Sequence, residues 1–294
     1  MEINQRVKGS TALLGLLGNP VAHSISPQLH NTISDMLGID AVYIAMNLER
    51  EKVREAVEGL RACSFLGFNV TVPYKEAVIE YCDELSGDVE IMGAANTVKN
   101  NNGRLCAYNT DGSGFIRALK LQTGQEVEGK KIVVLGAGGT ARSISVKLAT
   151  EGASEICIIN RTVQKARSIE DIVNKRIRNI VCSMGYEEAY SNNIIEQSDI
   201  IINTTSVGLH PDVENCPIEE NLILKKNQLV YDVIYKPEKT RLLKMAESFG
   251  CKTANGLGML ICQGIEAYEI WMERVIPQDV VEKVFQAFTK YSYH

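Results

Sequence analysis

Short apolar runs alternate with segments of helical periodicity along the N-terminal part of this 294-residue chain. The runs Ala12–Leu17, Tyr43–Met46 and Phe65–Val70 are typical of buried strands. Between them, Pro27–Leu37 indicates a helix with proline in its first turn, and Glu49–Leu60 collects its apolar residues on one helical face. Strands that alternate with helices favour a mostly parallel sheet covered by helices.

A β-hairpin is predicted at the end of this region. Two short segments, Asn96–Val98 and Leu105–Tyr108, flank the sequence Asn100-Asn101-Asn102-Gly103. Asparagine and glycine are the residues that tight hairpin turns prefer, so these two segments should pair as antiparallel strands.

From Lys131 onward the alternation of strands and helices becomes more regular. It predicts a doubly wound domain of the Rossmann type. The tail beyond Gly258 is helical by pattern, and we expect it to pack on the N-terminal domain. The expected strands are Ile132–Leu135, Glu155–Ile159, Asp199–Asn203 and Leu229–Val233, and the expected helices are Thr140–Thr150, Val163–Val173 and Lys239–Phe249.

The chain is therefore predicted to be an α/β protein with two domains and a cleft between them. The first, with a mostly parallel sheet, should comprise residues 1–112 plus 258–294. The second, the Rossmann-type doubly wound domain, should comprise residues 113–257.

Composition and charge narrow the class of protein. The chain is 45% hydrophobic and 23% charged, with a net charge of −5, which is ordinary for a soluble globular protein. Its lysines and arginines are scattered, so no nucleic-acid partner is expected. No apolar run reaches the length of a membrane helix, and Ala12–Leu17 fits a buried strand better than a signal peptide.

The cysteines indicate a reducing compartment. None of the 8 cysteines falls in a Cys-x-x-Cys pair, and several lie in apolar stretches. This pattern is typical of buried thiols in a cytoplasmic protein. The four histidines have no metal-ligand spacing, so we expect no structural metal.

A glycine-rich turn follows the strand Ile132–Leu135. Its sequence is Gly136-Ala137-Gly138-Gly139-Thr140-Ala141. Glycine allows the backbone to turn tightly and to approach a pyrophosphate, whose charge the N-terminus of the next helix accepts. A dinucleotide-binding domain preceded by a second domain with its own polar clusters suggests a redox enzyme that acts on a small molecule.

The end of the second Rossmann strand indicates which dinucleotide is bound. NAD-binding domains usually place a carboxylate there for the ribose hydroxyls, whereas this chain has Asn160-Arg161-Thr162, with Lys165 one turn later. A guanidinium group suits a 2′-phosphate, which a carboxylate would repel. The alternative is that these residues only cap a helix and that Arg161 is solvated. We favour NADP over NAD.

A pair of serines precedes the first helix. Ser24 and Ser26 occupy alternate positions, so their hydroxyls could point the same way and bind a carboxylate near the helix N-terminus. From these residues alone, N-capping by Ser26 is the simpler interpretation, although it leaves Ser24 unexplained.

Polar residues also follow the third predicted strand. Asn69 and Thr71 alternate at its end, and Lys75 lies in the turn that follows. At the carboxyl end of a parallel strand such groups face the ligand crevice. The small, polar segments Gly93–Thr97 and Tyr108–Gly112 add Asp111, which could form a proton-transfer pair with Lys75.

Taken in this order, the motifs closely resemble those of the shikimate dehydrogenase family. The resemblance extends over nearly the whole chain, and the joint order of the motifs is its most specific feature. The matching stretches are Gly18–Pro27, Asn69–Lys75, Gly93–Thr97, Asn109–Gly114, Gly136–Arg142, Asn160–Thr162, Asn203–Gly208, Asp232–Pro237, and Asn255–Leu260 with Gln263.

The resemblance implies reversible, NADPH-dependent reduction of 3-dehydroshikimate to shikimate, in the pathway to chorismate and the aromatic amino acids. By family analogy Lys75 and Asp111 are the catalytic pair, and residues 1–112 with 258–294 bind the substrate. Ser24, Ser26 and Tyr235 would bind the substrate carboxylate, and Asn69, Thr71, Asn96, Asp111 and Gln263 the ring hydroxyls. Cofactor contacts would come from Gly136, Ala137, Gly138, Gly139, Thr140, Ala141, Asn160, Arg161, Thr162, Lys165, Thr204, Val233, Gly256 and Met259.

Three alternatives stay open at this point. One is a quinate/shikimate dehydrogenase of broader specificity, which could use NAD. Another is a non-catalytic NADP-binding sensor. A folate-type methylene dehydrogenase fits the serine pair poorly. Lys165 stands where many relatives carry arginine, but a phosphate accepts either cation. The sequence is compatible with a monomer or a homodimer.

Overall fold

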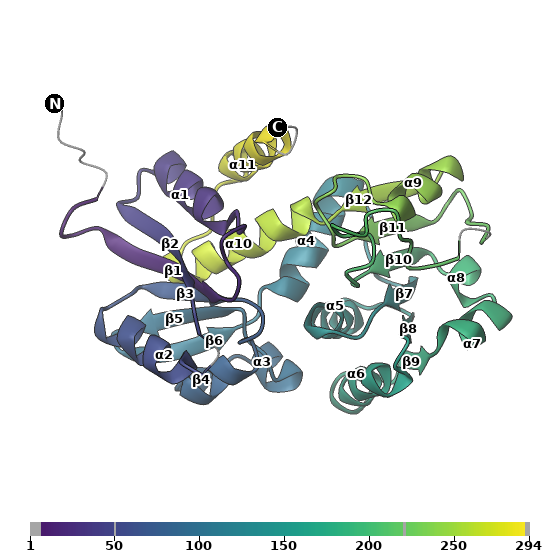
Figure 1. Ribbon diagram of the computed structural model, residues 1–294, viewed down its shortest axis with the longest axis horizontal. Helices are drawn as coiled ribbons and strands as arrows, with labels where there is room; N and C mark the ends of the chain where they lie inside the picture. Colours follow the sequence, from purple (N-terminus) through teal and green to yellow (C-terminus); the bar gives the residue numbers. More distant parts are fainter. Residues whose placement is uncertain (1–6, 50, 220–221, 292–294) are drawn as a thin grey trace. The chain divides into compact units, whose positions relative to one another are not determined.

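The computed structural model describes residues 7–49, 51–219 and 222–291, which form two compact units (Figure 1). The terminal unit comprises the chain up to Thr110 and from Gln263 onward, and the central unit comprises Asp111–Cys262. The division falls within the long helix α10, Leu257–Met272. No described helix is both long and apolar enough to cross a membrane.

The terminal unit is built on a six-stranded mixed sheet in the order β2-β1-β3-β5-β6-β4. β1, β2 and β3 are parallel, and the β5–β6 pair is the predicted antiparallel hairpin. Its turn places Asn102 and Gly103 at positive φ, a conformation that asparagine and glycine tolerate. The strands are β1 Ala12–Gly18, β2 Ala41–Asn47, β3 Gly67–Val70, β4 Glu84–Leu85, β5 Thr97–Asn101 and β6 Arg104–Tyr108.

Helices lie on both faces of this sheet. Figure 1 shows α1 and α11 along one side and α2 along the other. The tail packs on the sheet through Trp271, whose indole Nε1 donates to the Val98 carbonyl at 2.9 Å. A Cβ at Gly67 would lie 2.2 Å from this indole, so glycine is required there. The helices are α1 Ser26–Leu37, α2 Val53–Ala62, the 3-10 helix Ala77–Tyr81, α3 Gly87–Met92 and α11 Gln278–Tyr291.

The central unit is a doubly wound parallel sheet in the order β12-β11-β10-β7-β8-β9. This is the Rossmann order, with its topological switch point between β7 and β10. The strands are β7 Lys131–Leu135, β8 Glu155–Ile159, β9 Val181–Met184, β10 Ile200–Asn203, β11 Leu229–Asp232 and β12 Lys252–Asn255. Besides the first part of α10, the helices are α4 Asp111–Thr123, α5 Gly139–Thr150, α6 Val163–Arg176, α7 Tyr186–Ser191, α8 Ile194–Gln197 and α9 Arg241–Ser248.

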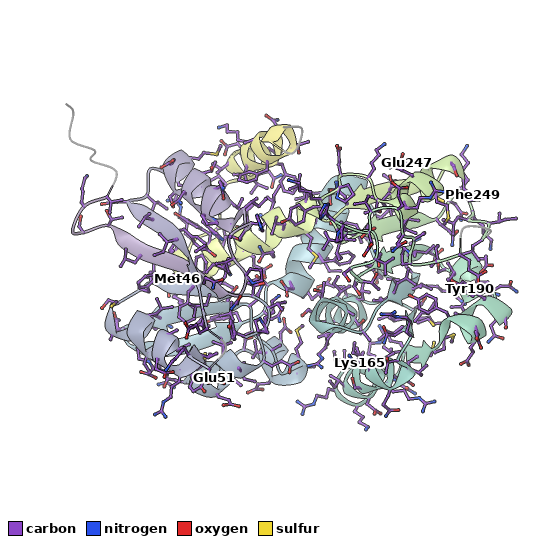
Figure 2. All side chains as sticks on the ribbon, in the orientation of Figure 1. Met46, Glu51, Lys165, Tyr190, Glu247 and Phe249 are labelled. Atoms are coloured by element: carbon purple, nitrogen blue, oxygen red, sulfur yellow. The ribbon has the colours of Figure 1, made fainter. Side chains whose placement is uncertain are left out.

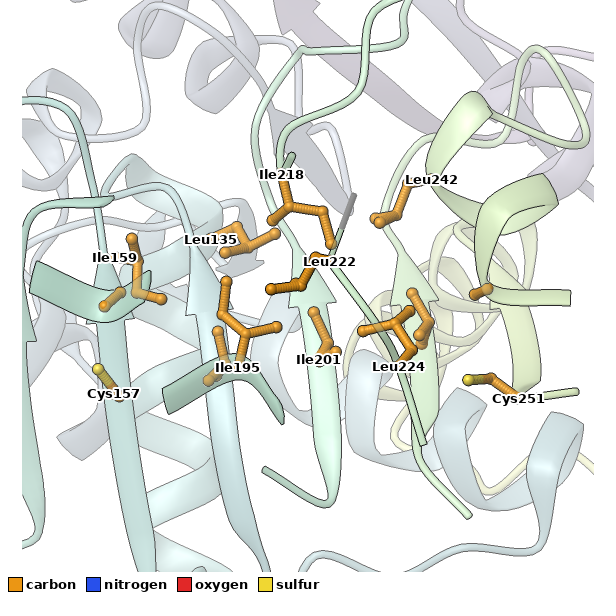
Figure 3. Close-up of a cluster of buried hydrophobic side chains, with 14 of the residues drawn as sticks. Leu135, Cys157, Ile159, Ile195, Ile201, Ile218, Leu222, Leu224, Leu242 and Cys251 are labelled. Carbon is orange, nitrogen blue, oxygen red and sulfur yellow. The ribbon is translucent and has the colours of Figure 1, made fainter. Parts of the chain in front are cut away.

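One face of this sheet carries a continuous apolar core. Leu135, Ile159 and Ile201, on three neighbouring strands, form one cluster with Ile218 and Leu222 from the loop before β11 (Figure 3). The opposite face is covered in part by α5, of which Ile144 and Leu148 are fully buried. The predicted fold class, two α/β units of which the second is of the Rossmann type, is confirmed.

Several predicted boundaries were wrong. The helix expected at Glu49–Leu60 begins at Val53 and continues to Ala62; of the expected span, Arg50 lies outside the described residues. The helix expected from Lys239 begins at Arg241, because the Thr240 hydroxyl accepts from the Leu243 N–H and caps it.

Candidate functional sites in the two units

The glycine-rich turn of the central unit lies at the switch point between β7 and β10. Gly136 has a φ of +102°, and a Cβ there would lie 2.7 Å from the Thr204 hydroxyl. Gly138 precedes the first residue of α5, and no side chain caps this helix. The first N–H groups of α5 are therefore not occupied by a capping side chain. Free N–H groups at a helix N-terminus are the arrangement that binds a phosphate.

A cavity of about 650 Å³ opens at this turn. Eight of the predicted cofactor residues line it: Gly136, Ala137, Gly138, Asn160, Arg161, Thr162, Lys165 and Thr204. They come from the ends of three neighbouring parallel strands, where nucleotides bind in this fold. The volume lies in the range of small-molecule and cofactor sites.

The remaining predicted cofactor residues do not line this cavity. Gly139, Thr140 and Ala141 form the first turn of α5, and the Ala141 side chain is fully buried. A Cβ at Gly256 would lie 1.9 Å from the Val233 carbonyl oxygen, so these two backbones are in direct contact. Met259, in the first turn of α10, is buried.

Two cations face the cavity beside the end of β8. Arg161 and Lys165 are both exposed, and neither forms an ion pair with a described residue. The Asn160 amide donates to the Thr162 carbonyl at 2.9 Å and shapes the turn. Thr162 precedes α6 without capping it through its side chain. The hydroxyl and both cations are therefore available to a phosphate. Thr162 does not cap α6 through its side chain, so that part of the alternative is wrong, whereas Arg161 is exposed as the alternative expected.

The far wall of the cavity consists of residues that no sequence motif indicated. It contains Tyr186 and Tyr190, whose rings are 6.1 Å apart, and the segment Cys216–Glu219 (Figure 2 labels Lys165 and Tyr190). Burial raises the pKa of Tyr186 to about 12, and nearby Arg161 opposes this. Tyr190 accepts from the Glu219 N–H at 3.1 Å. The only signal in the sequence was the two aromatic residues four apart on one helical face.

A buried carboxylate organises the end of β11. Asp232 is fully buried and accepts from the Asn203 amide at 3.0 Å, the Thr240 hydroxyl at 2.7 Å and the Ile234 N–H at 3.1 Å. Burial raises its pKa to about 6, against these three hydrogen bonds. The carboxylate fixes the turn that carries Val233 and Tyr235.

In the terminal unit, three predicted substrate residues meet in one hydrogen-bond network. The Asn69 amide donates to the Asn96 carbonyl and to the Thr97 hydroxyl, both at 3.0 Å. The Asn96 amide donates to Gln263 Oε1 at 3.3 Å. Residues from β3, from the segment before β5 and from α10 are thus brought together, although 167 positions separate Asn96 from Gln263.

The two serines also interact. The Ser24 hydroxyl donates to Ser26 Oγ at 3.1 Å and accepts from the Ser26 N–H at 3.2 Å. Ser26 is the first residue of α1 and makes no side-chain cap, since the capping position is held by Ile25. Capping by Ser26, the simpler interpretation from sequence, is therefore wrong. Both hydroxyls lie at the N-terminus of α1.

Thr71 and Lys75 follow β3 and are both half-buried. A Cβ at Gly18 would lie 2.3 Å from the Thr71 methyl group, which explains the glycine at the end of β1. The Lys75 carbonyl accepts from the Ala95 N–H at 2.8 Å. This bond ties the lysine backbone to the segment that carries Asn96.

Asp111 and Tyr235 belong to the central unit. Asp111 is the first residue of α4, where a carboxylate is favoured by the helix dipole, and it is buried. It follows Thr110, whose N–H donates to Asn96 Oδ1 at 2.8 Å. Tyr235 is half-buried, and burial raises the pKa of its phenol.

Three family models match the chain in order. They are the shikimate dehydrogenase substrate binding domain over residues 16–98, shikimate / quinate 5-dehydrogenase over residues 118–234, and the shikimate 5′-dehydrogenase C-terminal domain over residues 256–284. A curated shikimate dehydrogenase (NADP(+)) of Alkaliphilus metalliredigens is 42% identical over 280 residues, which cover 95% of this chain and 98% of that protein.

Solved structures of shikimate dehydrogenases also resemble this chain over nearly its whole length. Shikimate 5-dehydrogenase from Listeria monocytogenes, in complex with shikimate and NAD, superposes with a TM-score of 0.90 at 38% identity and covers 96% of this chain and 99% of its own. The enzyme from Thermus thermophilus, in complex with NADP(H) and shikimate, gives 0.83 at 31% identity, with coverage of 94% and 99%.

A Rossmann-type unit with a nucleotide-sized cavity, joined to a second α/β unit with a polar site, defines a two-domain oxidoreductase. The chain belongs to the shikimate dehydrogenase family. The resemblance seen in the motif order is confirmed.

Proposed function

We propose that this protein is an NADP-dependent dehydrogenase that interconverts 3-dehydroshikimate and shikimate. The observation that carries the proposal is the match along 95% of the chain to a curated NADP(+) enzyme of that activity. The polar network of Asn69, Asn96 and Gln263 supports it, because a polyhydroxylated ring needs several fixed hydrogen-bonding groups. In this proposal the terminal unit binds the substrate and the central unit binds the cofactor.

NADP fits the residues at the central cavity. The uncapped N-terminus of α5 suits the pyrophosphate, and Arg161 and Lys165 suit the 2′-phosphate, with no carboxylate at the end of β8 to repel it. Val233, Gly256 and Met259 would border the nicotinamide, in keeping with the family. When bound, the reduced cofactor supplies a hydride.

Lys75 and Asp111 would supply the proton chemistry. When the carbonyl of 3-dehydroshikimate is reduced, its oxygen must gain a proton, and the Lys75 ammonium can donate it. Asp111 would hold the ammonium and a substrate hydroxyl in place. Ser24 and Ser26, at the N-terminus of α1, would bind the substrate carboxylate with Tyr235, and Thr71 would bind a ring hydroxyl.

The first test is the initial rate of NADPH formation, followed by absorbance, with shikimate and NADP. Lys75→Ala should lower kcat by about 10²-fold to 10⁴-fold and change KM for shikimate much less, because the lysine acts mainly in the proton-transfer step. Lys52→Ala is the matched control, since Lys52 is exposed and pairs only with Glu55 among the described residues. An unchanged kcat in Lys75→Ala would refute the catalytic role.

The same assay separates the two candidate specificities. Shikimate with NADP should give a much higher kcat/KM than quinate with NAD. The reverse order would identify a quinate-using enzyme. Quinate activity at a low level fits the proposal, since one hydroxyl often discriminates only modestly between ligands.

We propose a cytoplasmic location as well, with small molecules as the partners. All eight cysteines are free thiols, as expected in a reducing compartment. The monomer and the homodimer are both compatible with the proposed chemistry.

A further inference from the structure

We propose that Tyr43 is a positioning residue, whose hydroxyl holds the Asn69 side chain so that Asn69 offers the substrate a hydrogen-bond acceptor and no donor. The inference rests on the proposed function, because it assigns a partner to a residue proposed to bind a ring hydroxyl. Tyr43 lies on β2 and belongs to none of the motifs that led to the family.

Tyr43 is itself firmly held. Its backbone N–H donates to Asn31 Oδ1 at 2.9 Å, and its carbonyl accepts from Asn31 Nδ2 at 3.0 Å. This clamp from α1 satisfies backbone groups that an edge strand would otherwise expose. The ring is 2% exposed and stacks on His30 with centroids 4.2 Å apart and planes inclined by 16°.

The hydroxyl of Tyr43 donates to Asn69 Oδ1 at 2.8 Å. The two hydrogens of Asn69 Nδ2 are directed at the Asn96 carbonyl and the Thr97 hydroxyl. Hydrogen bonds of normal geometry therefore occupy both donors and one acceptor lone pair of the amide, and the second lone pair has only the weaker contact with His30. A ligand hydroxyl can donate to that lone pair, whereas a ligand carbonyl finds no donor there.

The neutral His30 ring is the flat surface on which the Tyr43 ring stacks. It is fully buried, and neither imidazole nitrogen makes a hydrogen bond of normal geometry with a described residue. Burial lowers its pKa to about 3, although the nearby Asn69 side chain partly offsets this effect, so the ring is neutral at physiological pH. The Trp271 ring lies 5.2 Å from the His30 ring, inclined by 50°.

Tyr43 also lies beside one of the two serines. Burial raises the pKa of the phenol well above its usual value, and the Ser26 side chain opposes this. The Tyr43 hydroxyl, bonded to Asn69, which is proposed to bind a ring hydroxyl, thus also interacts with Ser26, which is proposed to bind the carboxylate. Fixing both contacts before the substrate arrives lowers the ordering cost of binding.

The experiment compares Tyr43→Phe with Tyr268→Phe in the full-length enzyme. Tyr268 is the matched control: it is also buried, its ring is 6.2 Å from His30, and its hydroxyl bonds to Ser34 at 2.9 Å instead of to Asn69. The readouts are KM and kcat with shikimate, KM for NADP, the shikimate Kd from calorimetry, and Tm.

Tyr43→Phe should raise KM and Kd for shikimate about fivefold to tenfold, the effect of losing one well-formed hydrogen bond. KM for NADP should stay unchanged and kcat should change much less than KM. Tyr268→Phe should leave every binding constant near the wild-type value, whatever its Tm. Equal KM values in the two variants, or loss of folded protein in Tyr43→Phe alone, would overturn the inference. A wild-type enzyme without shikimate-dependent activity would instead overturn the proposed function.

Discussion

The two glycines of the phosphate turn differ in what their backbones permit. Gly136 has a φ of +102°, and its missing Cβ leaves room for Thr204 and Thr205. Gly138 has a φ of −91°, and a Cβ there would meet nothing within 4 Å. The first glycine is therefore required by the protein itself, whereas the second leaves space for a ligand.

We expect Gly136→Ala to lower the free energy of unfolding by about 1–3 kcal/mol, because alanine is strained at this φ and crowds Thr204. Gly138→Ala should change it by less than about 0.5 kcal/mol and act on NADP binding alone. Urea unfolding monitored by circular dichroism, with NADP titrations alongside, measures both effects. Equal destabilisation in the two variants would contradict this account.

Arg161 and Lys165 carry the expected preference for NADP over NAD. Arg161→Ala or Lys165→Ala should raise KM for NADP about tenfold and leave KM for NAD nearly unchanged, since a charge-assisted hydrogen bond to the 2′-phosphate is lost. Lys175→Ala is the control, because Lys175 lies on α6, as Lys165 does, but pairs with Asp171. An equal rise in KM for both cofactors would show that the two cations do not bind the 2′-phosphate, because NAD lacks this group.

At the scale of elements, the central strands were predictable and the edge strands were not. β7, β8 and β10 are continuous apolar runs because both of their faces are covered. The edge strands β9 and β12 are half-exposed, and Lys252-Thr253-Ala254-Asn255 carries no apolar run at all. α7, which carries Tyr186 and Tyr190, follows β9 and was missed with it.

The turn after β11 should make stability depend on pH through Asp232. Its pKa is about 6 in the folded protein against a usual 3.8, so the folded state binds more protons between these values. The free energy of unfolding should therefore fall as pH rises from about 4 to about 6, by about 3 kcal/mol in total, and stay level above that.

Asp232→Asn should abolish this component, since an amide can keep the hydrogen bonds to Asn203, Ile234 and Thr240 without titrating. Urea unfolding at half-unit intervals from pH 4 to pH 7 gives the two curves. Parallel curves for the wild type and the variant would show that Asp232 does not titrate in this range.

At the scale of the whole molecule, the sequence motifs identified most of the residues that line the cofactor cavity. How the residues of a site are brought together in space could be known only from the fold. The Asn96–Gln263 hydrogen bond joins residues far apart in the chain, and no local pattern encodes that distance. The aromatic wall at Tyr186 and the positioning residue Tyr43 were missed because each is an ordinary apolar position in its own element. The Lys75–Asp111 pair and the substrate contacts stay predictions.

The single tryptophan of the chain allows the two units to be followed separately. Trp271 is buried in the terminal unit, so its fluorescence reports on that unit, whereas circular dichroism reports on both. Each unit has its own sheet and core, so we expect the two signals to respond differently to ligands. Shikimate at about 100 times its Kd should stabilise the terminal unit by about 2.7 kcal/mol and shift the fluorescence transition. NADP should shift mainly the circular dichroism transition. Coincident transitions that move together with either ligand would mean that the two units unfold as one cooperative structure.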